Sequence, residues 1–386
     1  MQNSRWEGAV KRYLLQYIKE DLADKVILIT GPRQVGKTTL AEMVGEGYQY
    51  LNYDRSEHRE TLYKKAWDRS ASYLIFDEIH KMKNWKRWLK GIYDTDRLTP
   101  PIIVTGSAKF DTYKKVGDSL AGRYFQFRLY PLDIAEAVSL LELNANEAFN
   151  RLMEVGGFPE PFLKNTQRFY NRWQSSHLDI ILRQDLIDLE TVSDIKAIEV
   201  LIDLLSKQVG STISYSSLAR TLEVSDKTIK RWLTLLENIY VIFRVNSFSQ
   251  KISRSILKAP KFYFYDNARV KGDNGAKLEN LTAISLRKHV IYQKDCYGNS
   301  LGLHYLRRIG GQKIDFLISK DQTPQTMVEC KWKDAVPSKN FEVFSAELGK
   351  CEKIQLLGQL DQDATYPNGI QVRQAAKWLS KNTAYF

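Results

Sequence analysis

A glycine-bounded loop follows a short apolar run near the start of the chain. Residues 26–30 are Val-Ile-Leu-Ile-Thr, and residues 31–38 are Gly-Pro-Arg-Gln-Val-Gly-Lys-Thr. The glycines let the backbone wrap a phosphate, the lysine can contact the β- and γ-phosphate oxygens, and the threonine hydroxyl can bind Mg²⁺. A glycine loop without a ligand is the alternative, but the flanking strand and helix patterns favour a P-loop for ATP and Mg²⁺. The expected nucleotide contacts are Gly31, Pro32, Arg33, Gln34, Val35, Gly36, Lys37, Thr38 and Thr39.

Two acidic residues end a second apolar run. Residues 73–76 are Tyr-Leu-Ile-Phe and lead directly into Asp77 and Glu78. An apolar strand that ends in acids is typical of the carboxyl edge of a parallel sheet, where ligands bind. We expect Asp77, with Thr38, to hold Mg²⁺, and Glu78 to orient and deprotonate the water that attacks the γ-phosphate. Such strand ends also occur without a site, but this one follows a complete P-loop.

A third apolar run and a later arginine add groups that could act on the same phosphate. Residues 101–104 precede Thr105 and Ser107, either of which could sense the γ-phosphate. Arg123 precedes a predicted strand and is a candidate arginine finger, because a cation opposes the charge that develops in phosphoryl transfer. A surface arginine paired with a carboxylate is the alternative. The predicted catalytic residues are therefore Lys37, Glu78, Ser107 and Arg123.

Several segments together resemble a known group of proteins. They are residues 31–38, 74–80, 105–107, 120–123 and 156–159. The group is the prokaryotic AAA-superfamily ATPases that join an ATPase module to a C-terminal domain of unknown function, and the resemblance runs over most of the chain. It implies an α/β fold with a P-loop NTPase parallel sheet of the additional-strand type, in which the third strand lies between the first two. It also implies ATP binding and hydrolysis, but no substrate.

The composition predicts a globular protein that favours polyanionic partners. The chain has 386 residues, of which 43% are hydrophobic, and this allows ordinary domain cores. Lys+Arg 57 against Asp+Glu 45 gives a net charge of +12, which favours DNA or RNA without identifying either. No stretch has the apolar length that a membrane requires, and the N-terminus lacks a secretory signal. The widely spaced Cys296, Cys330 and Cys351 suit a reducing compartment, so we expect a cytoplasmic protein.

Changes in periodicity divide the chain into four predicted domains. They are a P-loop ATPase core at 1–135, a helical lid at 136–194, a winged helix-turn-helix at 195–250 and a restriction-endonuclease-like domain at 251–386. The third helix of the winged helix would present basic side chains to DNA phosphates or base edges. The alternative is a solvated basic face on a domain that packs against protein. The basic residues are Lys227, Lys230 and Arg231.

The last predicted domain carries a separate acidic pattern. Asp315 lies in one apolar strand, Glu329 and Lys331 lie two residues apart in the next, and Glu279 lies early on a helix. Residues two apart on a strand share a face. Asp315 and Glu329, with Glu279, could therefore chelate a hard cation while Lys331 acts as a catalytic group. The pattern resembles the restriction-endonuclease-like core, but that fold is also retained as a binding scaffold, so metal binding and cleavage are separate predictions.

These patterns lead to two hypotheses of different classes. In the first, a Mg²⁺-dependent ATPase couples its nucleotide cycle to the winged-helix and nuclease-like parts, which act on nucleic acid. In the second, the protein is a nucleotide-dependent switch or signalling scaffold that binds protein partners, and its nuclease-like domain is inactive. An arginine finger that acts in trans would require a homo-oligomer.

Overall fold

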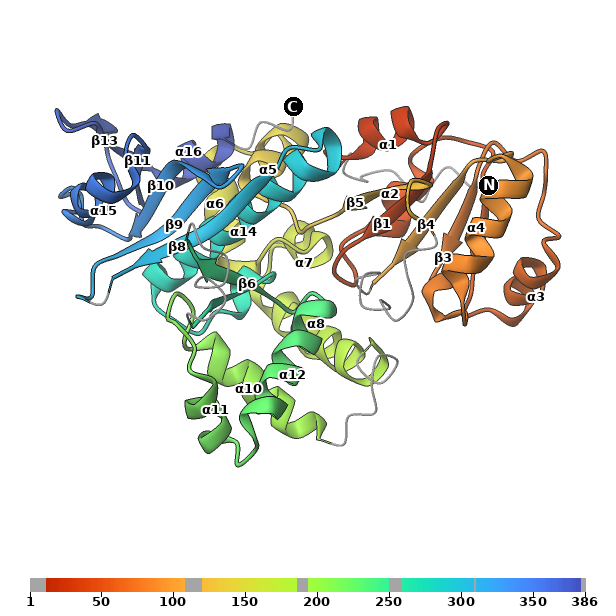
Figure 1. The fold of residues 1–386 in the computed structure, drawn as a ribbon, viewed down its shortest axis with the longest axis horizontal. Coiled ribbons are helices and arrows are strands. Elements are labelled where there is room, and N and C mark those ends of the chain that lie inside the picture. The colour runs from red at the N-terminus through yellow and green to blue at the C-terminus, as the bar shows by residue number, and fades with distance from the viewer. Residues whose placement is uncertain (1–11, 108–119, 186–193, 250–258, 309, 383–386) are drawn as a thin grey trace. The chain divides into compact units, whose positions relative to one another are not determined.

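The computed structural model describes residues 12–107, 120–185, 194–249, 259–308 and 310–382 (Figure 1). The chain forms two compact units. The first contains Met1–Tyr130, Arg183–Glu190 and Asn238–Tyr240, and the second contains Pro131–Leu182, Thr191–Glu237 and Val241–Phe386. The division into four domains stays a prediction.

A five-stranded parallel sheet forms the centre of the first unit. Its strands are β1 (Val26–Thr30), β2 (Gln49–Asn52), β3 (Leu74–Asp77), β4 (Ile102–Gly106) and β5 (Tyr124–Arg128). They lie in the order β2-β3-β4-β1-β5, and every neighbouring pair is parallel. Because β4 lies between β1 and β3, the predicted additional-strand order is confirmed. The segments that follow these three strands leave the sheet at one edge, where ligands of parallel sheets bind.

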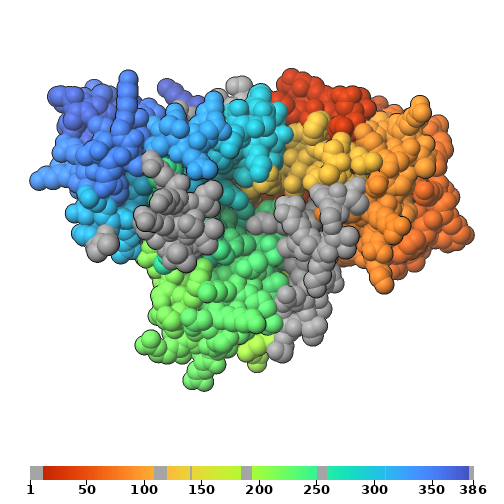
Figure 2. All heavy atoms as spheres, in the orientation of Figure 1, coloured from red at the N-terminus to blue at the C-terminus, as the bar shows by residue number. Residues whose placement is uncertain are grey.

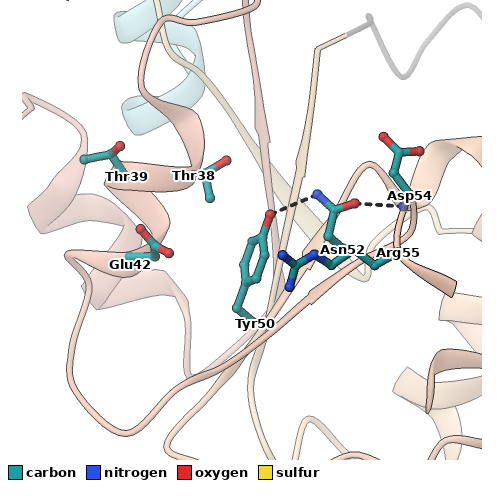
Figure 3. A pocket seen from close by; sticks show the side chains of 7 residues that line it. All are labelled: Thr38, Thr39, Glu42, Tyr50, Asn52, Asp54 and Arg55. Atoms are coloured by element: carbon teal, nitrogen blue, oxygen red, sulfur yellow. Dashed lines mark hydrogen bonds between the residues drawn. The ribbon is translucent and has the colours of Figure 1, made fainter. Parts of the chain in front are cut away.

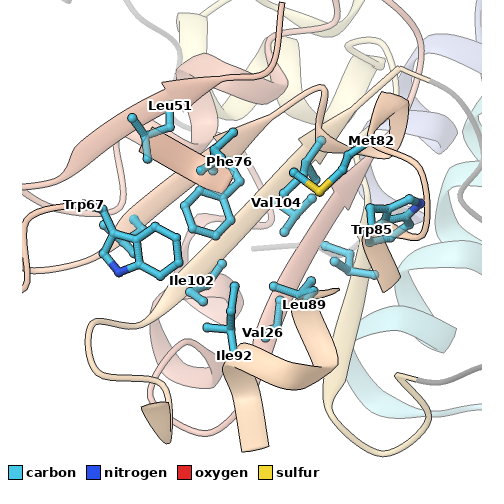
Figure 4. Packing of buried hydrophobic residues seen from close by; sticks show 14 of the residues in the cluster. Val26, Leu51, Trp67, Phe76, Met82, Trp85, Leu89, Ile92, Ile102 and Val104 are labelled. Carbon is cyan, nitrogen blue, oxygen red and sulfur yellow. The ribbon is translucent and has the colours of Figure 1, made fainter. Parts of the chain in front are cut away.

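Burial on both faces explains why these strands are continuous apolar runs. Every residue of β1, β3 and β4 is buried. Phe76 of β3 belongs to one apolar cluster with Trp67, Leu89 and Ile102 (Figure 4). The ring centres of Phe76 and Trp67 lie 5.4 Å apart. The unit also contains the helices α1 (Leu15–Asp21), α2 (Lys37–Glu42), α3 (Ser56–Lys64) and α4 (Trp85–Asp96), and the short turn η2 (Ile79–Lys81).

The second unit begins with short helices. They are α5 (Ile134–Leu141), α6 (Ala145–Val155), α7 (Pro159–Lys164) and α8 (Gln167–Ile180). Local side chains satisfy the free amide groups at several helix starts. Asn144 and Glu147 form a capping box on α6, and Thr166 caps α8. Among the residues that the structure describes, no helix has the length and apolar character needed to cross a membrane.

A three-helix group follows in the region predicted as a winged helix. Its helices are α10 (Ile195–Ser206), α11 (Tyr215–Thr221) and α12 (Asp226–Asn238), and the antiparallel strands β6 (Ile242–Ser247) and β7 (Lys261–Phe264) come next. Figure 2 shows these helices in green, with a broad face open to solvent. Lys227, Lys230 and Arg231 are exposed, as expected. This order of elements is the one predicted for a winged helix, and that assignment stays a prediction.

An eight-stranded mixed sheet forms the centre of the second unit, in the order β12-β13-β11-β10-β9-β8-β6-β7. Its further strands are β8 (Leu301–Arg307), β9 (Lys313–Lys320), β10 (Thr323–Lys331), β11 (Glu352–Leu357), β12 (Ala364–Thr365) and β13 (Ile370–Gln374). Helices α14 (Asn274–Tyr297), α15 (Asn340–Leu348) and α16 (Ala375–Asn382) belong to the same unit. Asn246 of β6 pairs with His304 of β8. One sheet therefore continues across the domain boundary that the sequence predicts at residue 250.

Two glycines between α6 and α7 allow close packing within the second unit. Gly156 has a φ of +71°, and a Cβ atom there would lie 2.4 Å from Oδ1 of Asp266. A Cβ atom on Gly157 would lie 2.2 Å from the carbonyl oxygen of Leu132. The amide of Leu132 donates to the carbonyl of Gly157 at 2.7 Å. Only residues without a side chain fit both positions.

A buried lysine joins α14 to the start of α5. Nζ of Lys288 lies 3.2 Å from Oδ1 of Asp133 and also pairs with Glu136, and all three side chains are almost fully buried. Nζ donates to the carbonyl of Pro131 at 3.4 Å as well. Burial raises the pKa of Asp133, although the charge of Lys288 opposes the shift. One ammonium group therefore supplies positive charge to both carboxylates.

Replacement of Lys288 by Met is expected to lower the free energy of unfolding of the second unit by about 3–5 kcal/mol, because two buried carboxylates lose their counter-ion. Lys207 provides the matched control. It is half-exposed and pairs with Asp203 one helical turn away at 2.7 Å, so Lys207→Met should cost less than about 1 kcal/mol. Urea unfolding followed by circular dichroism measures both changes. Equal losses in the two variants would contradict the prediction.

Candidate functional site

The loop between β1 and α2 follows a backbone path that its two glycines permit. Gly31 has a φ of +150°, and a Cβ atom there would lie 2.1 Å from the carbonyl oxygen of Leu129. Gly36 has a φ of +94° and forms the N-cap of α2. Residues with side chains rarely adopt these conformations. The backbone of the loop therefore accounts for both glycine positions of the motif.

Two buried basic residues hold this loop. Lys37 donates from Nζ to the carbonyl oxygens of the first two loop residues, at 3.1 and 2.7 Å. Arg12 donates from Nη1 to the carbonyl of Val35 at 2.9 Å, and from Nη2 to the carbonyl of Tyr130, which lies just beyond β5. Arg12 thus fastens the loop to the end of the neighbouring strand.

Asp77 accepts hydrogen bonds from side chains of several elements. Its Oδ2 accepts from the hydroxyl of Tyr50 at 2.6 Å and from Nδ2 of Asn52 at 3.3 Å, both on β2. The hydroxyl of Thr38 donates to the same oxygen at 3.4 Å. The other oxygen accepts from Thr105 on β4. The two predicted Mg²⁺ ligands, Thr38 and Asp77, are therefore adjacent, and the carboxylate has a fixed orientation.

The protonation states of two neighbours follow from burial. Burial, followed by the charge of Asp77, raises the pKa of Tyr50, so its phenol stays protonated and donates at neutral pH. Nε2 of His80 lies 3.4 Å from Oε2 of Glu78. Burial and the nearby Lys81 lower the pKa of His80 to about 3. His80 is therefore neutral at physiological pH, and its contact with Glu78 is not an ion pair.

A polar cavity opens beside Thr38. Its volume is about 670 Å³, and its lining consists of Thr38, Thr39, Glu42, Tyr50, Asn52, Asp54 and Arg55. Figure 3 shows the threonines on one side of the cavity and the bonded pair of Tyr50 and Asn52 on the other. This volume lies in the range of small-molecule sites. The charged and hydroxyl-bearing lining suits a polar ligand.

Most of the predicted site residues lie at one edge of the sheet. Ser107 follows β4, which lies between β1 and β3, and it is buried. Thr105 stands in register with Asp77 of β3. Glu78 directly follows β3 and has a φ of +55°, so the chain turns sharply there. The structure thus brings Lys37, Thr38, Asp77, Glu78 and Ser107 to the same edge, and their catalytic roles stay predictions.

Arg123 does not join this group. Its carbonyl accepts from the amide of Val26 at the start of β1, which places it at the amino edge of the sheet, a strand length from the P-loop. Its guanidinium donates to the carboxylate of Asp94 at 2.8 and 3.3 Å. Because β5 runs parallel to β1, this position lies away from the P-loop of the same chain, and the role of Arg123 as an arginine finger stays a prediction. The surface-pair alternative fits, and action in trans stays a prediction.

The acidic residues of the predicted nuclease-like site are paired with lysines. Nζ of Lys261 lies 3.0 Å from Oε1 of Glu279 and 3.5 Å from Oδ1 of Asp315. Nζ of Lys331 lies 3.2 Å from Oε1 of Glu329. Within the described ranges, no group of three or more histidine, cysteine or carboxylate side chains is arranged to hold a metal ion. Ammonium groups thus lie beside the carboxylates of Glu279, Asp315 and Glu329, where the sequence predicts a cation.

Sequence reasoning missed several residues that hold the two sites. Arg12 lies among residues 8–22, whose apolar side chains recur at helical spacing, and in such a segment a basic residue usually faces solvent. Tyr50 and Asn52 lie two apart on a strand, and that spacing was a usable signal that both face one side. Lys261 interrupts the apolar run over 259–265. A lysine within a buried strand signals a paired charge.

Two family models match the chain. Residues 23–138 match a family described as an AAA domain, and residues 146–270 match a family described as a domain of unknown function. The first match contains the P-loop, Asp77 and Glu78. The match supports an AAA-type ATPase assignment for residues 23–138. The resemblance found in the sequence is thus confirmed for this part, whereas the winged-helix and nuclease-like assignments stay predictions.

Similar proteins occur in several prokaryotes. An uncharacterized protein of Methanocaldococcus jannaschii is 25% identical over 332 residues, which are 77% of this chain and 73% of that protein. One from Mycobacterium tuberculosis is 24% identical over 322 residues, 78% of this chain and 71% of that protein. One from Haemophilus influenzae is 23% identical over 412 residues, 96% of this chain and 98% of that protein. Their names assign no activity.

A solved structure also shows a partial likeness. It is a signal transduction ATPase with numerous domains and a tetratricopeptide repeat sensor, from Pyrococcus horikoshii. The sequences are 16% identical, and the TM-score is 0.24, with 72% of this chain and 44% of that chain covered. The chain thus spans less than half of that protein. A likeness this low carries no argument about function.

Replacement of Arg12 by Met is expected to weaken ATP binding roughly tenfold, because the P-loop loses charged hydrogen bonds that hold its carbonyl groups. Arg123→Met is the matched control. Its guanidinium lies at the opposite edge of the sheet and pairs with Asp94, so affinity should change less than about twofold. Titration of a fluorescent ATP analogue in the presence of Mg²⁺ measures both. Unchanged affinity in folded Arg12→Met would contradict the assignment.

Proposed function

We propose that the AAA domain binds ATP together with Mg²⁺ and hydrolyses the γ-phosphate bond. The observation that carries this proposal is the distance of 3.4 Å between the hydroxyl of Thr38 and Oδ2 of Asp77, at the end of the P-loop. Hydroxyl and carboxylate oxygens are ligands that Mg²⁺ accepts, so this pair fits the ion. Mg²⁺ held there would neutralise charge that develops on the phosphate oxygens.

The remaining residues at this edge supply binding and proton transfer. Lys37 would exchange its bonds to loop carbonyls for bonds to the β- and γ-phosphate oxygens. Glu78, on the turn after Asp77, would orient the attacking water and accept its proton. Ser107 or Thr105 would contact the γ-phosphate. Tyr50 and Asn52 hold Asp77 in place and are positioning residues, since they bond to the carboxylate rather than to the reacting atoms.

Two substitutions distinguish nucleotide binding from hydrolysis. Lys37→Ala should abolish detectable ATP binding, because the principal cation for the phosphates is lost. Glu78→Gln should bind ATP as the natural protein does but hydrolyse it at least ~100-fold more slowly, since a general base contributes about that much. Nucleotide binding and phosphate release, measured on the same preparations, test both. Unchanged turnover in Glu78→Gln would remove Glu78 as the base.

We also propose that the second unit binds nucleic acid, and that this nucleic acid is the ligand on which the ATPase acts. The supporting observations are the net charge of +12 and the exposure of Lys227, Lys230 and Arg231 on α12. Exposed cations on one helix can meet successive phosphates of a duplex. Under this proposal, binding weakens steeply with salt because each phosphate that the protein neutralises releases counterions.

Joint replacement of Lys227, Lys230 and Arg231 by Ala should lower DNA affinity. It should also reduce the slope of log affinity against log salt by roughly 0.9 for each phosphate that the variant no longer neutralises. Arg172, exposed on α8, provides the control, and Arg172→Ala should leave the slope unchanged. Fluorescence anisotropy with duplex DNA and with RNA, at several salt concentrations, gives the slopes. ATP turnover is followed in parallel with each nucleic acid.

The competing hypothesis makes the opposite prediction in the same experiment. A nucleotide-dependent switch that binds protein would show ATP turnover or binding that neither DNA nor RNA changes. Its affinity for nucleic acid would also lack the steep salt dependence. That result would exclude nucleic acid as the output and leave the ATPase assignment intact, because Lys37 and Glu78 are tested separately.

A further inference from the structure

We propose that Lys261 serves as the built-in cation of the C-terminal acidic cluster, so that Glu279 and Asp315 bind a divalent metal ion only when this lysine is removed. The resemblance to a restriction-endonuclease-like core implies a metal ion at these carboxylates. The residues present do not fit that ion. The Lys261 cluster, defined as Lys261, Glu279, Asp315 and Lys313, carries the argument.

The geometry places one ammonium group between two carboxylates. Lys261 lies on β7 and is 2% exposed, and Asp315 on β9 is also 2% exposed. Nζ of Lys261 lies 3.0 Å from Oε1 of Glu279 and 3.5 Å from Oδ1 of Asp315. An ion bridging these two oxygens would have to occupy the volume that Nζ takes. Displacing a buried ammonium from two carboxylates carries a large desolvation cost.

Further contacts surround both carboxylates. The hydroxyl of Tyr263 donates to Oε1 of Glu279 at 2.7 Å. Oε2 of Glu279 faces Gly210 so closely that a Cβ atom there would lie 2.5 Å away. The amide of Cys330 donates to Oδ2 of Asp315 at 3.0 Å. A hard cation such as Mg²⁺ requires about six oxygen ligands near 2 Å, and this packed arrangement does not supply them.

The charges of the region already balance. Lys313 places Nζ 3.3 Å from Oδ1 of Asp315, so two lysines face the carboxylates of Glu279 and Asp315. Burial by itself would raise the pKa of Asp315, but Lys261 and Lys313 outweigh it and the pKa is lowered. The nearby Glu329 has its own partner in Lys331. A divalent ion would therefore add two positive charges to a region without a charge deficit.

The arrangement has a consequence for the nuclease-like resemblance. Metal-dependent cleavage of a phosphodiester needs a cation that activates water or stabilises the leaving oxygen. An ammonium group on a buried side chain cannot coordinate water in this way. The C-terminal domain then retains the fold of such a core without metal-dependent chemistry. The domain binds its ligand and does not cleave it.

Mn²⁺ binding to the full-length protein without nucleotide tests this proposal, with electron paramagnetic resonance as the readout. Asp77→Asn is present in every sample so that the ATP site lacks its predicted Mg²⁺ carboxylate. The parent should bind no Mn²⁺ that depends on Asp315. Lys261→Met should gain about one Mn²⁺ per chain, at least roughly tenfold tighter than any binding by the parent, because two carboxylates lose their cation.

Matched variants assign the gained site. Lys261→Arg keeps the positive charge and should gain no Mn²⁺, whereas adding Asp315→Asn to Lys261→Met should abolish the gain. A folded Lys261→Met protein that gains no Mn²⁺ would overturn the proposal. If Lys261→Met fails to fold, Mn²⁺ binding by the parent tests the proposal instead. Stoichiometric Mn²⁺ binding by the parent that Asp315→Asn or Glu279→Gln removes would overturn the proposal, and binding insensitive to both would support it.

Discussion

The hydrogen bonds to Asp77 are the constraint on which the candidate ATP site depends. Thr105 reaches the carboxylate from β4, Tyr50 and Asn52 reach it from β2, and Thr38 reaches it from α2. These contacts exist only because β2, β3 and β4 are adjacent and parallel, so that their carboxyl ends meet. The sheet order thus determines the position of the carboxylate. The glycines of the P-loop then bring the Thr38 hydroxyl to it.

The second unit has a different feature. At two places among the described residues, a buried lysine lies between two carboxylates. Lys288 lies between Asp133 and Glu136, and Lys261 lies between Glu279 and Asp315. Burying such groups gives little net stability, because desolvation offsets most of the attraction. Each nevertheless restricts how its elements can pair, since any other packing would leave a buried charge without a partner.

Local patterns predicted which residues meet at the candidate ATP site, because these residues lie directly after apolar strands. The runs that end at Thr30, Asp77 and Gly106 define β1, β3 and β4, and their order follows from the resemblance. Arg123 could not be placed in this way, since its position depends on the direction in which β5 runs along β1. A motif in sequence does not reveal which edge of a sheet a residue occupies.

The buried lysine beside the C-terminal acids was not predicted, for a related reason. The pattern of Asp315, Glu329 and Lys331 is defined by its acidic residues. Lys261, which pairs with Asp315, lies on another strand. Lys261 is separated from Asp315 by a long helix, α14, and one strand, β8, in sequence, so no spacing rule connects them. Tyr50 and Arg12 were missed because their partners are backbone or side-chain atoms distant in sequence. Pairings of this kind become visible only in the folded chain.

Asp77 and Asp315 differ in the charge of the groups that surround them, and this difference underlies both metal-site proposals. Both are buried, and both accept several hydrogen bonds. The side chains that donate to Asp77 are hydroxyl and amide groups without charge, so its negative charge remains available to attract Mg²⁺. Asp315 faces two ammonium groups, which neutralise the same attraction. The charge of the donors, rather than the number of acids in a motif, therefore separates a cation-binding site from a structural ion pair.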